Sequence, residues 1–302
     1  MEAFFGNQLL FGEEILNRLH IFAGPVLDQL MVAITVMGNE IFYTLLIPLI
    51  YWCASKRVAI LAGGSFLVGT MVNDALKDVW MNPRPDPANL VPNINELNER
   101  YIPHNSPGFP SGHSQSAVAF WGALAWYVGR TPFVAACVII ILLIAYSRLY
   151  LGVHFFGDVL GGLSFGLVTL ALYIVAVAWI RKKHELINRY ALIAASLVVP
   201  YLLFKILPGH EQAKTLGVLS GFLVGIILEK GRVDFNPGGT LVKKLIMILA
   251  GLAGLFIIKA GIKPLLPDLA SADFLRYWLM GMWVTLVAPW IFVRFGIARQ
   301  DG

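Results

Sequence analysis

Residues 132–180 decide the fold of this chain and read PFVAACVIIILLIAYSRLYLGVHFFGDVLGGLSFGLVTLALYIVAVAWI. Two apolar runs, 132–147 and 156–180, flank a short polar segment. A helix needs roughly 20 apolar residues to cross the hydrocarbon core of a bilayer. Backbone groups left unpaired in lipid are costly, so apolar runs of this kind form helices. The stretch therefore predicts two membrane-spanning helices with polar side chains at the connection between them.

The same pattern recurs along the whole chain, in which 58% of the residues are hydrophobic and 14% are charged. Soluble domains of this length carry a larger charged fraction. The polar alternation of membrane barrel strands is not found in the sequence. We predict an all-α polytopic membrane helical bundle with ten spans, or eight or nine if the shortest segments do not cross. The predicted spans are 21–37, 40–54, 58–79, 113–129, 132–147, 156–180, 189–207, 214–228, 241–262 and 274–294.

The N-terminal segment, residues 1–19, contains acidic residues and no basic opening or cleavage site, so it does not match a signal peptide. We predict an interfacial helix there. In the ten-span arrangement, the 23 Lys and Arg residues divide 14 to 9 between the two sides. Positive residues are enriched in cytoplasmic loops, which predicts that both termini are cytoplasmic. The sequence contains neither a long basic run nor a basic stripe with interleaved aromatic residues, so it does not indicate a nucleic-acid partner.

Three cations stand at predicted span ends on the non-cytoplasmic side. Lys77 and Arg84 lie in KDVWMNPRP, residues 77–85, and Arg148 lies in SRLYLGVHFFGD, residues 147–158. Isolated charges near the bilayer are costly and usually functional. Arg guanidinium groups match the paired oxygens of a phosphate, and Lys adds a point charge. The three side chains predict a site that binds a phosphoryl group without a metal.

Between these two motifs in the chain lies the second of three, FPSGHSQS at residues 109–116, which comes just before a long apolar run. Ser111 is the predicted N-cap of the helix that follows. Free amides at a helix N-terminus bind anions, and Gly112 allows a phosphate to come close to the backbone. The motif therefore predicts a cradle for an oxyanion.

His154 and Asp158 are four residues apart, which places them on one face of a helix. A carboxylate that accepts from one imidazole nitrogen leaves the other nitrogen bare and nucleophilic. We therefore predict His154 as the nucleophile, Asp158 as its orienting group and His113 as the general acid. Each motif alone has a plainer interpretation, such as snorkelling cations, an ordinary helix cap or a structural pair. Their occurrence in order on one predicted side favours a catalytic site.

The three motifs together resemble the type 2 phosphatidic acid phosphatases, whose signature is K-x6-RP, PSGH and SR-x5-H-x3-D. Every signature position is filled here, by residues 77–85, 110–113 and 147–158. The resemblance implies a six-helix phosphatase core, residues 20–184, and hydrolysis without metal or cofactor. It implies attack by His154, orientation by Asp158 and proton donation by His113. It also implies phosphate binding by Lys77, Arg84, Ser111, Gly112 and Arg148.

Residues 185–302 lie outside the resemblance and form a predicted C-terminal transmembrane extension of about four helices. Lys205, Lys259 and Lys263 fall near the outer ends of these predicted spans. Snorkelling to the bilayer surface is the favoured interpretation, and contact with an anionic head group is the alternative. A homodimer surface and a lipid slot are further interpretations of the extension.

The predicted function is hydrolysis of a lipid phosphate or diphosphate through a phosphohistidine. The site would face the non-cytoplasmic side of a bacterial-type inner membrane. Substrates consistent with the site are a polyprenyl diphosphate, phosphatidylglycerophosphate, phosphatidate or a sphingoid-base phosphate. A lipid-linked phosphotransferase and a lipid transporter or flippase are the alternatives. His154 with Asp158 argues against transport, because binding alone needs the cations but no oriented nucleophile.

Overall fold

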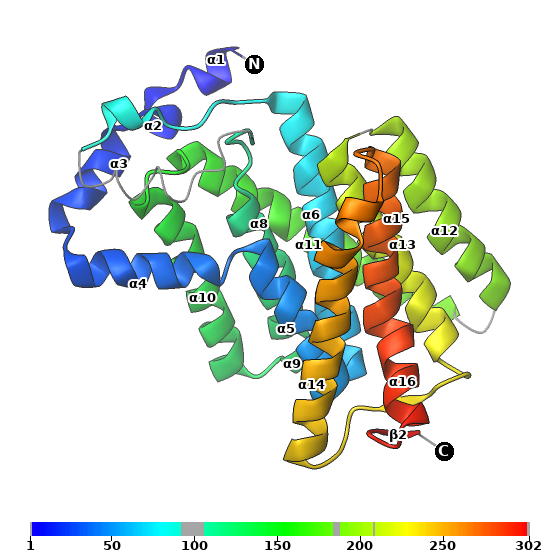
Figure 1. The fold of residues 1–302 in the computed structure, drawn as a ribbon. Coiled ribbons are helices and arrows are strands. Elements are labelled where there is room, and N and C mark those ends of the chain that lie inside the picture. The colour runs from blue at the N-terminus through cyan, green and yellow to red at the C-terminus, as the bar shows by residue number, and fades with distance from the viewer. Residues whose placement is uncertain (1, 92–105, 184–187, 208, 301–302) are drawn as a thin grey trace. The chain divides into compact units, whose positions relative to one another are not determined.

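The computed structural model describes residues 2–91, 106–183, 188–207 and 209–300. Nearly all of its elements are helices (Figure 1), which confirms the predicted all-α class. The strands among the described residues are two-residue segments, β1 (Phe235–Asn236) and β2 (Arg299–Gln300), which pair antiparallel. This small pair closes the end of the chain onto the connection that precedes α14.

The described helices are divided by chain order into three consecutive groups. The first comprises α1 (Glu2–Phe5), α2 (Gln8–Phe11), α3 (Glu14–Leu19), η1 (His20–Phe22), α4 (Pro25–Val36), α5 (Glu40–Cys53) and α6 (Lys56–Trp80). The second comprises η2 (Pro87–Asn89), α8 (Gly112–Ala117), η3 (Val118–Gly122), α9 (Ala123–Val128), α10 (Thr131–Tyr150) and α11 (Phe156–Lys183). The third comprises α12 (Arg189–Ile206), α13 (His210–Glu229), α14 (Leu241–Phe256), η5 (Ile257–Gly261), η6 (Lys263–Leu265), α15 (Ala270–Met282), η7 (Trp283–Val287) and α16 (Ala288–Arg294). The interfacial helix predicted over residues 1–19 is thus three short helices.

Seven helices among the described residues are long and apolar enough to cross a membrane. They are α6, α10, α11, α12, α13, the run from α14 to Leu265, and the run from α15 through α16. An eighth span results if α4 and α5, which meet at a bend of 56°, cross together. The described helices therefore give fewer spans than the ten predicted, and they reach the lower alternative of eight only if α4 and α5 form one crossing. With 12 and 14 residues, α4 and α5 are each shorter than the roughly 20 residues that a complete crossing needs.

Helix α4 lies across the C-terminal half of α10 (Figure 1). Asp28 near the start of α4 accepts a hydrogen bond from the hydroxyl of Tyr150 at 2.5 Å, and Thr35 near its end accepts one from Arg148 at 2.6 Å. Both halves of α4 therefore contact the same end of α10. These polar contacts hold the predicted span 21–37 against the end of α10 that carries the third motif. The sides of the membrane on which the two termini lie remain predictions.

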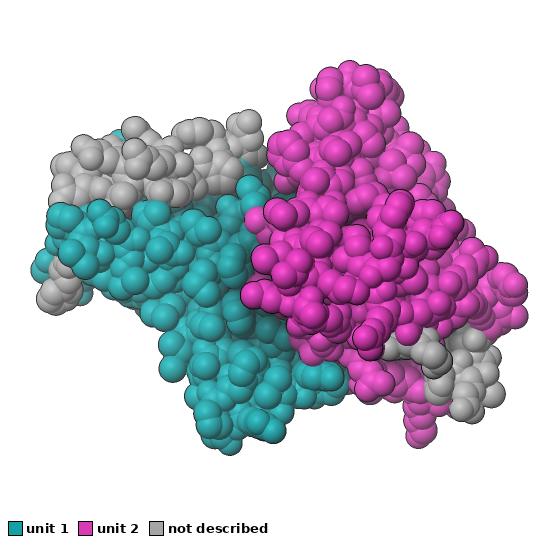
Figure 2. Space-filling view, turned by 60° about the horizontal axis from the view of Figure 1, so that its bottom comes forward, with its two compact units in different colours: residues 1–43, 72–174 teal, residues 44–71, 175–302 magenta. Residues whose placement is uncertain are grey.

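The chain forms two compact units, shown in teal and magenta in Figure 2. Unit 1 is Met1–Tyr43 with Val72–Ile174, and unit 2 is Thr44–Met71 with Val175–Gly302. All eight predicted site residues belong to unit 1. In unit 2, the Nε1 of Trp52 donates to the carbonyl of Val284 at 2.8 Å, so α5 packs with C-terminal helices. The domain boundaries at 19/20 and 184/185 remain predictions.

A stripe of glycines lets α13 and α15 pack closely within unit 2. Gly217, Gly221 and Gly225 recur every fourth residue and so lie on one face of α13. A Cβ at Gly221 would overlap the carbonyl oxygen of Trp278, and one at Gly225 would overlap the hydroxyl of Thr285. Small residues at this spacing allow membrane helices to approach through their backbones. The stripe therefore sets the separation of the two helices.

We expect Gly221→Ala to destabilise the protein by roughly 1–3 kcal/mol, because the added methyl group meets backbone and cannot be accommodated by a rotamer change. The matched control is Gly261→Ala, where the added Cβ would meet its nearest atom at 3.7 Å. This control should be neutral or stabilising, since alanine is the better helix former. Melting temperatures of the purified variants in one detergent test the prediction. Equal melting temperatures would show that the glycine contact does not set the packing.

Candidate active site

The three predicted motifs converge in unit 1, from the end of α6, the segment that follows it, the start of α8, and the turn between α10 and α11. Hydrogen bonds to backbone carbonyl groups join them directly. The amide of Ser111 donates to the carbonyl of Asp158 at 2.9 Å, and the guanidinium of Arg84 donates to the carbonyl of Val153 at 2.8 Å. Hydrogen bonds therefore connect both the first and the second motif to the third.

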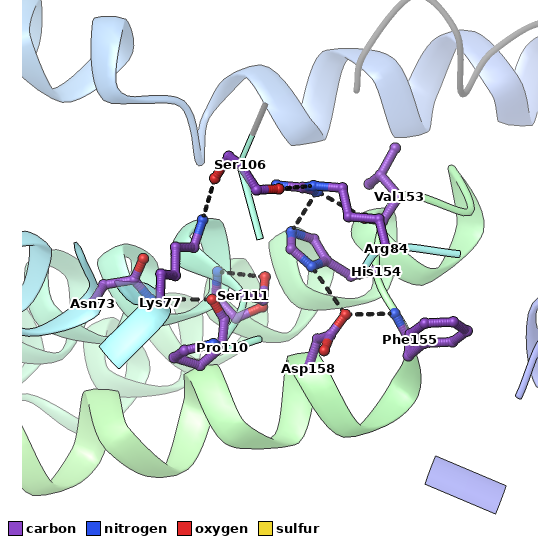
Figure 3. A network of polar contacts seen from close by, with 11 residues as sticks. Asn73, Lys77, Arg84, Ser106, Pro110, Ser111, Val153, His154, Phe155 and Asp158 are labelled. Carbon is purple, nitrogen blue, oxygen red and sulfur yellow. Dashed lines mark hydrogen bonds and ion pairs between the residues drawn. The ribbon is translucent and has the colours of Figure 1, made fainter. Parts of the chain in front are cut away.

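The imidazole of His154 lies between Arg84 and Asp158 (Figure 3). Nη1 of Arg84 is 3.2 Å from Nε2 of His154, and Nδ1 of His154 is 3.3 Å from Oδ2 of Asp158. A guanidinium has donors and no acceptor, so the first contact requires a bare Nε2. The proton of the neutral ring then sits on Nδ1 and points to the carboxylate. The geometry thus assigns the tautomer that leaves Nε2 with its lone pair.

The carboxylate of Asp158 is held in place by the backbone. Its Oδ2 also accepts from the amide of Phe155 at 2.9 Å, and its side chain is fully buried. Asp158 lies in the first turn of α11, so this contact with Phe155, just before the helix, is a local one. The orientation of the imidazole therefore derives from the start of a long helix rather than from a free loop.

Electrostatics keep the imidazole of His154 neutral. Burial lowers the pKa of His154 well below its ordinary value of 6.5, and the positive charges of Arg84, Arg148 and Lys77 lower it further. Burial also lowers the pKa of Arg84, to about 10, which leaves its guanidinium charged at neutral pH. A neutral base beside fixed cations has the protonation state that nucleophilic attack on phosphorus requires.

The three cations are held mainly by neutral acceptors. Nζ of Lys77 donates to the hydroxyl of Ser106 at 3.0 Å, and Nε of Arg84 donates to the carbonyl of Ser106 at 2.8 Å. Nη1 of Arg148 donates to the hydroxyl of Thr35 at 2.6 Å, while its buried Nε has no partner among the described residues. Neutral acceptors orient these cations without cancelling their charge, so the charge remains available to an anion.

The second motif forms the wall beside these cations. The hydroxyl of Ser111 caps α8 by accepting from the amide of Ser114 at 3.5 Å. A side chain at Gly112 would meet the amide oxygen of Asn73 at 3.0 Å. Asn73 also donates to the carbonyl of Pro110 at 3.2 Å and to the side chain of Gln115 at 2.8 Å. The start of α8 is thus fixed to α6 by a buried amide.

A cavity of about 230 Å³ opens where these groups meet. A phosphoryl group fits within it, since one water molecule occupies roughly 30 Å³. Ser111 and Asp158 stand behind this lining, as a helix cap and a support for His154. The described lining contains three Lys or Arg side chains, two histidines and no carboxylate. It comprises Thr35, Val36, Asn39, Lys77, Arg84, Ser106, Gly112, His113, Arg148 and His154.

Sequence reasoning missed Thr35, Asn73 and Ser106, which position the predicted residues. A signal existed for Asn73, because it is a polar residue inside the predicted span 58–79 and lies one turn before Lys77. Thr35 and Ser106 gave no comparable signal. Threonine is common in apolar helices, and Ser106 lies in a long polar connection. Their roles follow from contacts between segments far apart in the chain.

Two family patterns match the chain. The PAP2 superfamily pattern covers residues 41–182, and a pattern described as "PAP2 superfamily phosphatase, transmembrane extension" covers residues 213–300. The first includes all eight predicted site residues. The second covers most of the C-terminal helices, for which the sequence analysis found no family resemblance.

Several curated proteins are similar over about half of this chain. Phosphatidylglycerophosphatase B of Bacillus subtilis is 32% identical over 53% of this chain and 80% of its own length. Undecaprenyl-diphosphatase BcrC of the same species is 30% identical over 58% of this chain and 89% of its own. Lipid phosphate phosphatase delta of Arabidopsis thaliana is 25% identical over 58% of this chain, but only 44% of the plant protein is covered.

A solved structure also matches, that of a transmembrane PAP2 type phosphatidylglycerolphosphate phosphatase from Bacillus subtilis. It is 27% identical and covers 56% of this chain and 85% of the other, with a TM-score of 0.43.

We expect the ring of His154 to titrate below pH 6.5, the ordinary histidine value. Because its pKa is lowered, the ring stays neutral at pH 6.5 and takes up a proton only as the pH falls further. Nitrogen-15 NMR of protein labelled at histidine can follow this, with the His154 signal assigned from a His154→Gln sample. A midpoint at or above 6.5 would contradict the described electrostatics.

Proposed function

Because the chain belongs to the PAP2 superfamily, we propose that it hydrolyses a lipid phosphate or diphosphate, with His154 as nucleophile. The observation that carries this proposal is the position of the imidazole between Arg84 and Asp158, which leaves Nε2 bare inside a cationic cavity. The relatives named above are phosphatases of lipid phosphates, which supports the same class of reaction here.

The reaction proceeds in two steps. In the first, the lone pair of His154 Nε2 attacks phosphorus, the bond from phosphorus to the lipid oxygen breaks, and His113 gives that oxygen a proton. Burial and the cations lower the pKa of His113, so it carries this proton only when the anionic phosphate offsets their charge. In the second, water attacks the phosphohistidine, the N–P bond breaks, and His113 takes the proton of the water. Attack requires Arg84 to move its Nη1 from the ring nitrogen to a phosphate oxygen, where Lys77 and Arg148 also stabilise the developing charge.

The substrate proposal rests on the chemistry of the site and on the relatives. By their names, those relatives act on phosphatidylglycerophosphate, undecaprenyl diphosphate and lipid phosphates. Sphingosine-1-phosphate phosphatase 2 of Homo sapiens is also similar, at 32% identity over 47% of this chain and 35% of its own length. We propose a phosphate or diphosphate on a membrane-embedded chain as the substrate class.

We expect purified protein to release phosphate from at least one of four lipids in the presence of EDTA. These are phosphatidylglycerophosphate, phosphatidate, undecaprenyl diphosphate and sphingosine-1-phosphate. His154→Ala should lower the rate by roughly 10³-fold or more, because it removes the nucleophile. His113→Ala should slow formation of the intermediate by about 10²–10⁴-fold. With a ³²P-labelled lipid, protein-bound label should be stable in alkali and labile in acid, and absent from His154→Ala.

Arg18→Ala is the control for this experiment, because the Arg18 side chain is 73% exposed and its ion pair among the described residues is with Glu14, one helix turn away. It should retain the parent rate. Equal phosphate release by His154→Ala and the parent would remove the proposed nucleophile. Transfer of label to added water-soluble alcohols, with little free phosphate, would favour the phosphotransferase. Binding of the lipids without any turnover would favour transport.

We also propose that the site faces the non-cytoplasmic side and that the N-terminal helices lie on that same side. In support, His20 contacts the carbonyl of Tyr150 at 2.8 Å, and Asn17 donates to the carbonyl of Asn89 at 3.0 Å. Residues 2–39 thus stay at the level of the motifs. Moving Arg18 to this side still leaves the greater number of Lys and Arg residues opposite the site, as the positive-inside rule requires. We propose that the C-terminus is cytoplasmic, as the distribution of Lys and Arg residues predicts.

Cysteine labelling tests this topology in intact cells. In a Cys53→Ala, Cys137→Ala background, Leu9→Cys and Ala88→Cys should react with an impermeant maleimide, because both positions are exposed and on the proposed outer side. Arg232→Cys, also exposed, should react only after the cells are opened. Labelling of Ala88→Cys only in opened cells would reverse the proposed orientation. Labelling of Leu9→Cys only in opened cells would return the N-terminus to the cytoplasm.

A further inference from the structure

A second charged cavity lies in unit 2, apart from the residues proposed for hydrolysis. It has a volume of about 520 Å³ and is lined by residues at the start of α13, the end of the α14 run and the start of α15. Its charged and aromatic lining consists of His210, Lys214, Lys259, Lys263, Asp268, Asp273, Arg276 and Tyr277. Four Lys or Arg side chains thus face two carboxylates.

The contacts leave part of this positive charge uncompensated. Asp273 accepts from Arg276 at 2.5 Å and contacts Nδ1 of His210 at 2.7 Å, so one carboxylate serves two basic groups. Lys214 pairs with Glu211 at 2.5 Å. Within the described part of the chain, neither Lys259 nor Lys263 takes part in an ion pair.

Arg276 distinguishes this cavity from a ring of snorkelling cations. Its side chain is 5% exposed, and its Nη1 donates to the carbonyl of Lys259 at 3.3 Å. Its buried Nε has no partner among the described residues. Snorkelling places a charged head group in water, whereas this guanidinium is withdrawn from water. A buried cation with an unused donor is costly unless a further acceptor reaches it.

We propose that this cavity binds an oxyanion of the phosphate class. Arg276 offers an unused donor in the interior, Lys259 and Lys263 offer free ammonium groups at the rim, and His210 has its Nε2 directed away from Asp273. Helices α13 and α15 both begin at the cavity, and their N-terminal dipoles add to the attraction for negative charge. The phosphate of a lipid head group and free inorganic phosphate share this chemistry. The proposal does not depend on hydrolysis at His154.

Phosphate binding to the full-length protein tests the proposal. The background is Arg84→Ala, which weakens the cavity of unit 1, and the probe is ³²P inorganic phosphate in detergent at constant ionic strength. We expect Lys259→Gln with Lys263→Gln to weaken the remaining phosphate binding by about tenfold or more. The matched control is Lys182→Gln with Lys183→Gln. It removes two exposed cations from the C-terminal end of α11, which does not line the cavity, and should leave phosphate binding unchanged.

Competition identifies the source of the anion. Displacement of the labelled phosphate by phosphatidylglycerol in mixed micelles, but not by phosphatidylcholine, would support a lipid head group. Persistence of the label against both lipids would support free phosphate, and either result sustains the oxyanion site. Phosphate binding that is equal in both double variants, or no phosphate binding in the Arg84→Ala background, would overturn it. Hydrolysis by the Lys259 and Lys263 double variant in the otherwise unchanged protein is measured separately and should persist.

Discussion

The candidate site depends on the contact between the guanidinium of Arg84 and Nε2 of His154. A permanently charged donor faces the nitrogen that would attack phosphorus, so that nitrogen carries no proton. On the other side of the ring, Asp158 takes the remaining N–H. Because each ring nitrogen has a partner of defined chemistry, the tautomer of His154 and the direction of its lone pair are fixed together. The repulsion from nearby cations, which lowers the pKa of His154, acts in the same direction.

The two cavities use similar residue types in different ways. In unit 1, the cations are oriented by hydroxyl and carbonyl oxygens of Thr35, Ser106 and Val153, so their charge is available to a reacting phosphoryl group. In unit 2, Arg276 shares a carboxylate with His210, which reduces the local charge. The first arrangement suits strong stabilisation of a developing charge. The second suits reversible binding of an anion.

Helix packing places these groups at the ends of membrane-spanning segments. In unit 1, α4 lies across α10 and is held by hydrogen bonds from Tyr150 and Arg148, so it supplies Thr35 to the site. In unit 2, the glycine stripe brings α13 and α15 together and thereby places His210 near Asp273. Neither arrangement requires a soluble domain, because the bilayer and close backbone contact supply the framework.

The sequence alone determined the membrane class, the helical fold, the family and the eight candidate site residues. These follow from local properties, namely the length of apolar runs and the residue types at fixed spacing in three motifs. Its count of ten spans exceeds the seven or eight long apolar helices among the described residues, because short apolar segments such as that of α4 were counted as separate crossings. It also did not locate Thr35, Asn73 and Ser106 at the site, nor the cavity around Arg276. Those depend on which residues of distant segments meet, and only the tertiary structure decides that, because hydrogen bonds and ion pairs form between groups adjacent in space rather than along the chain.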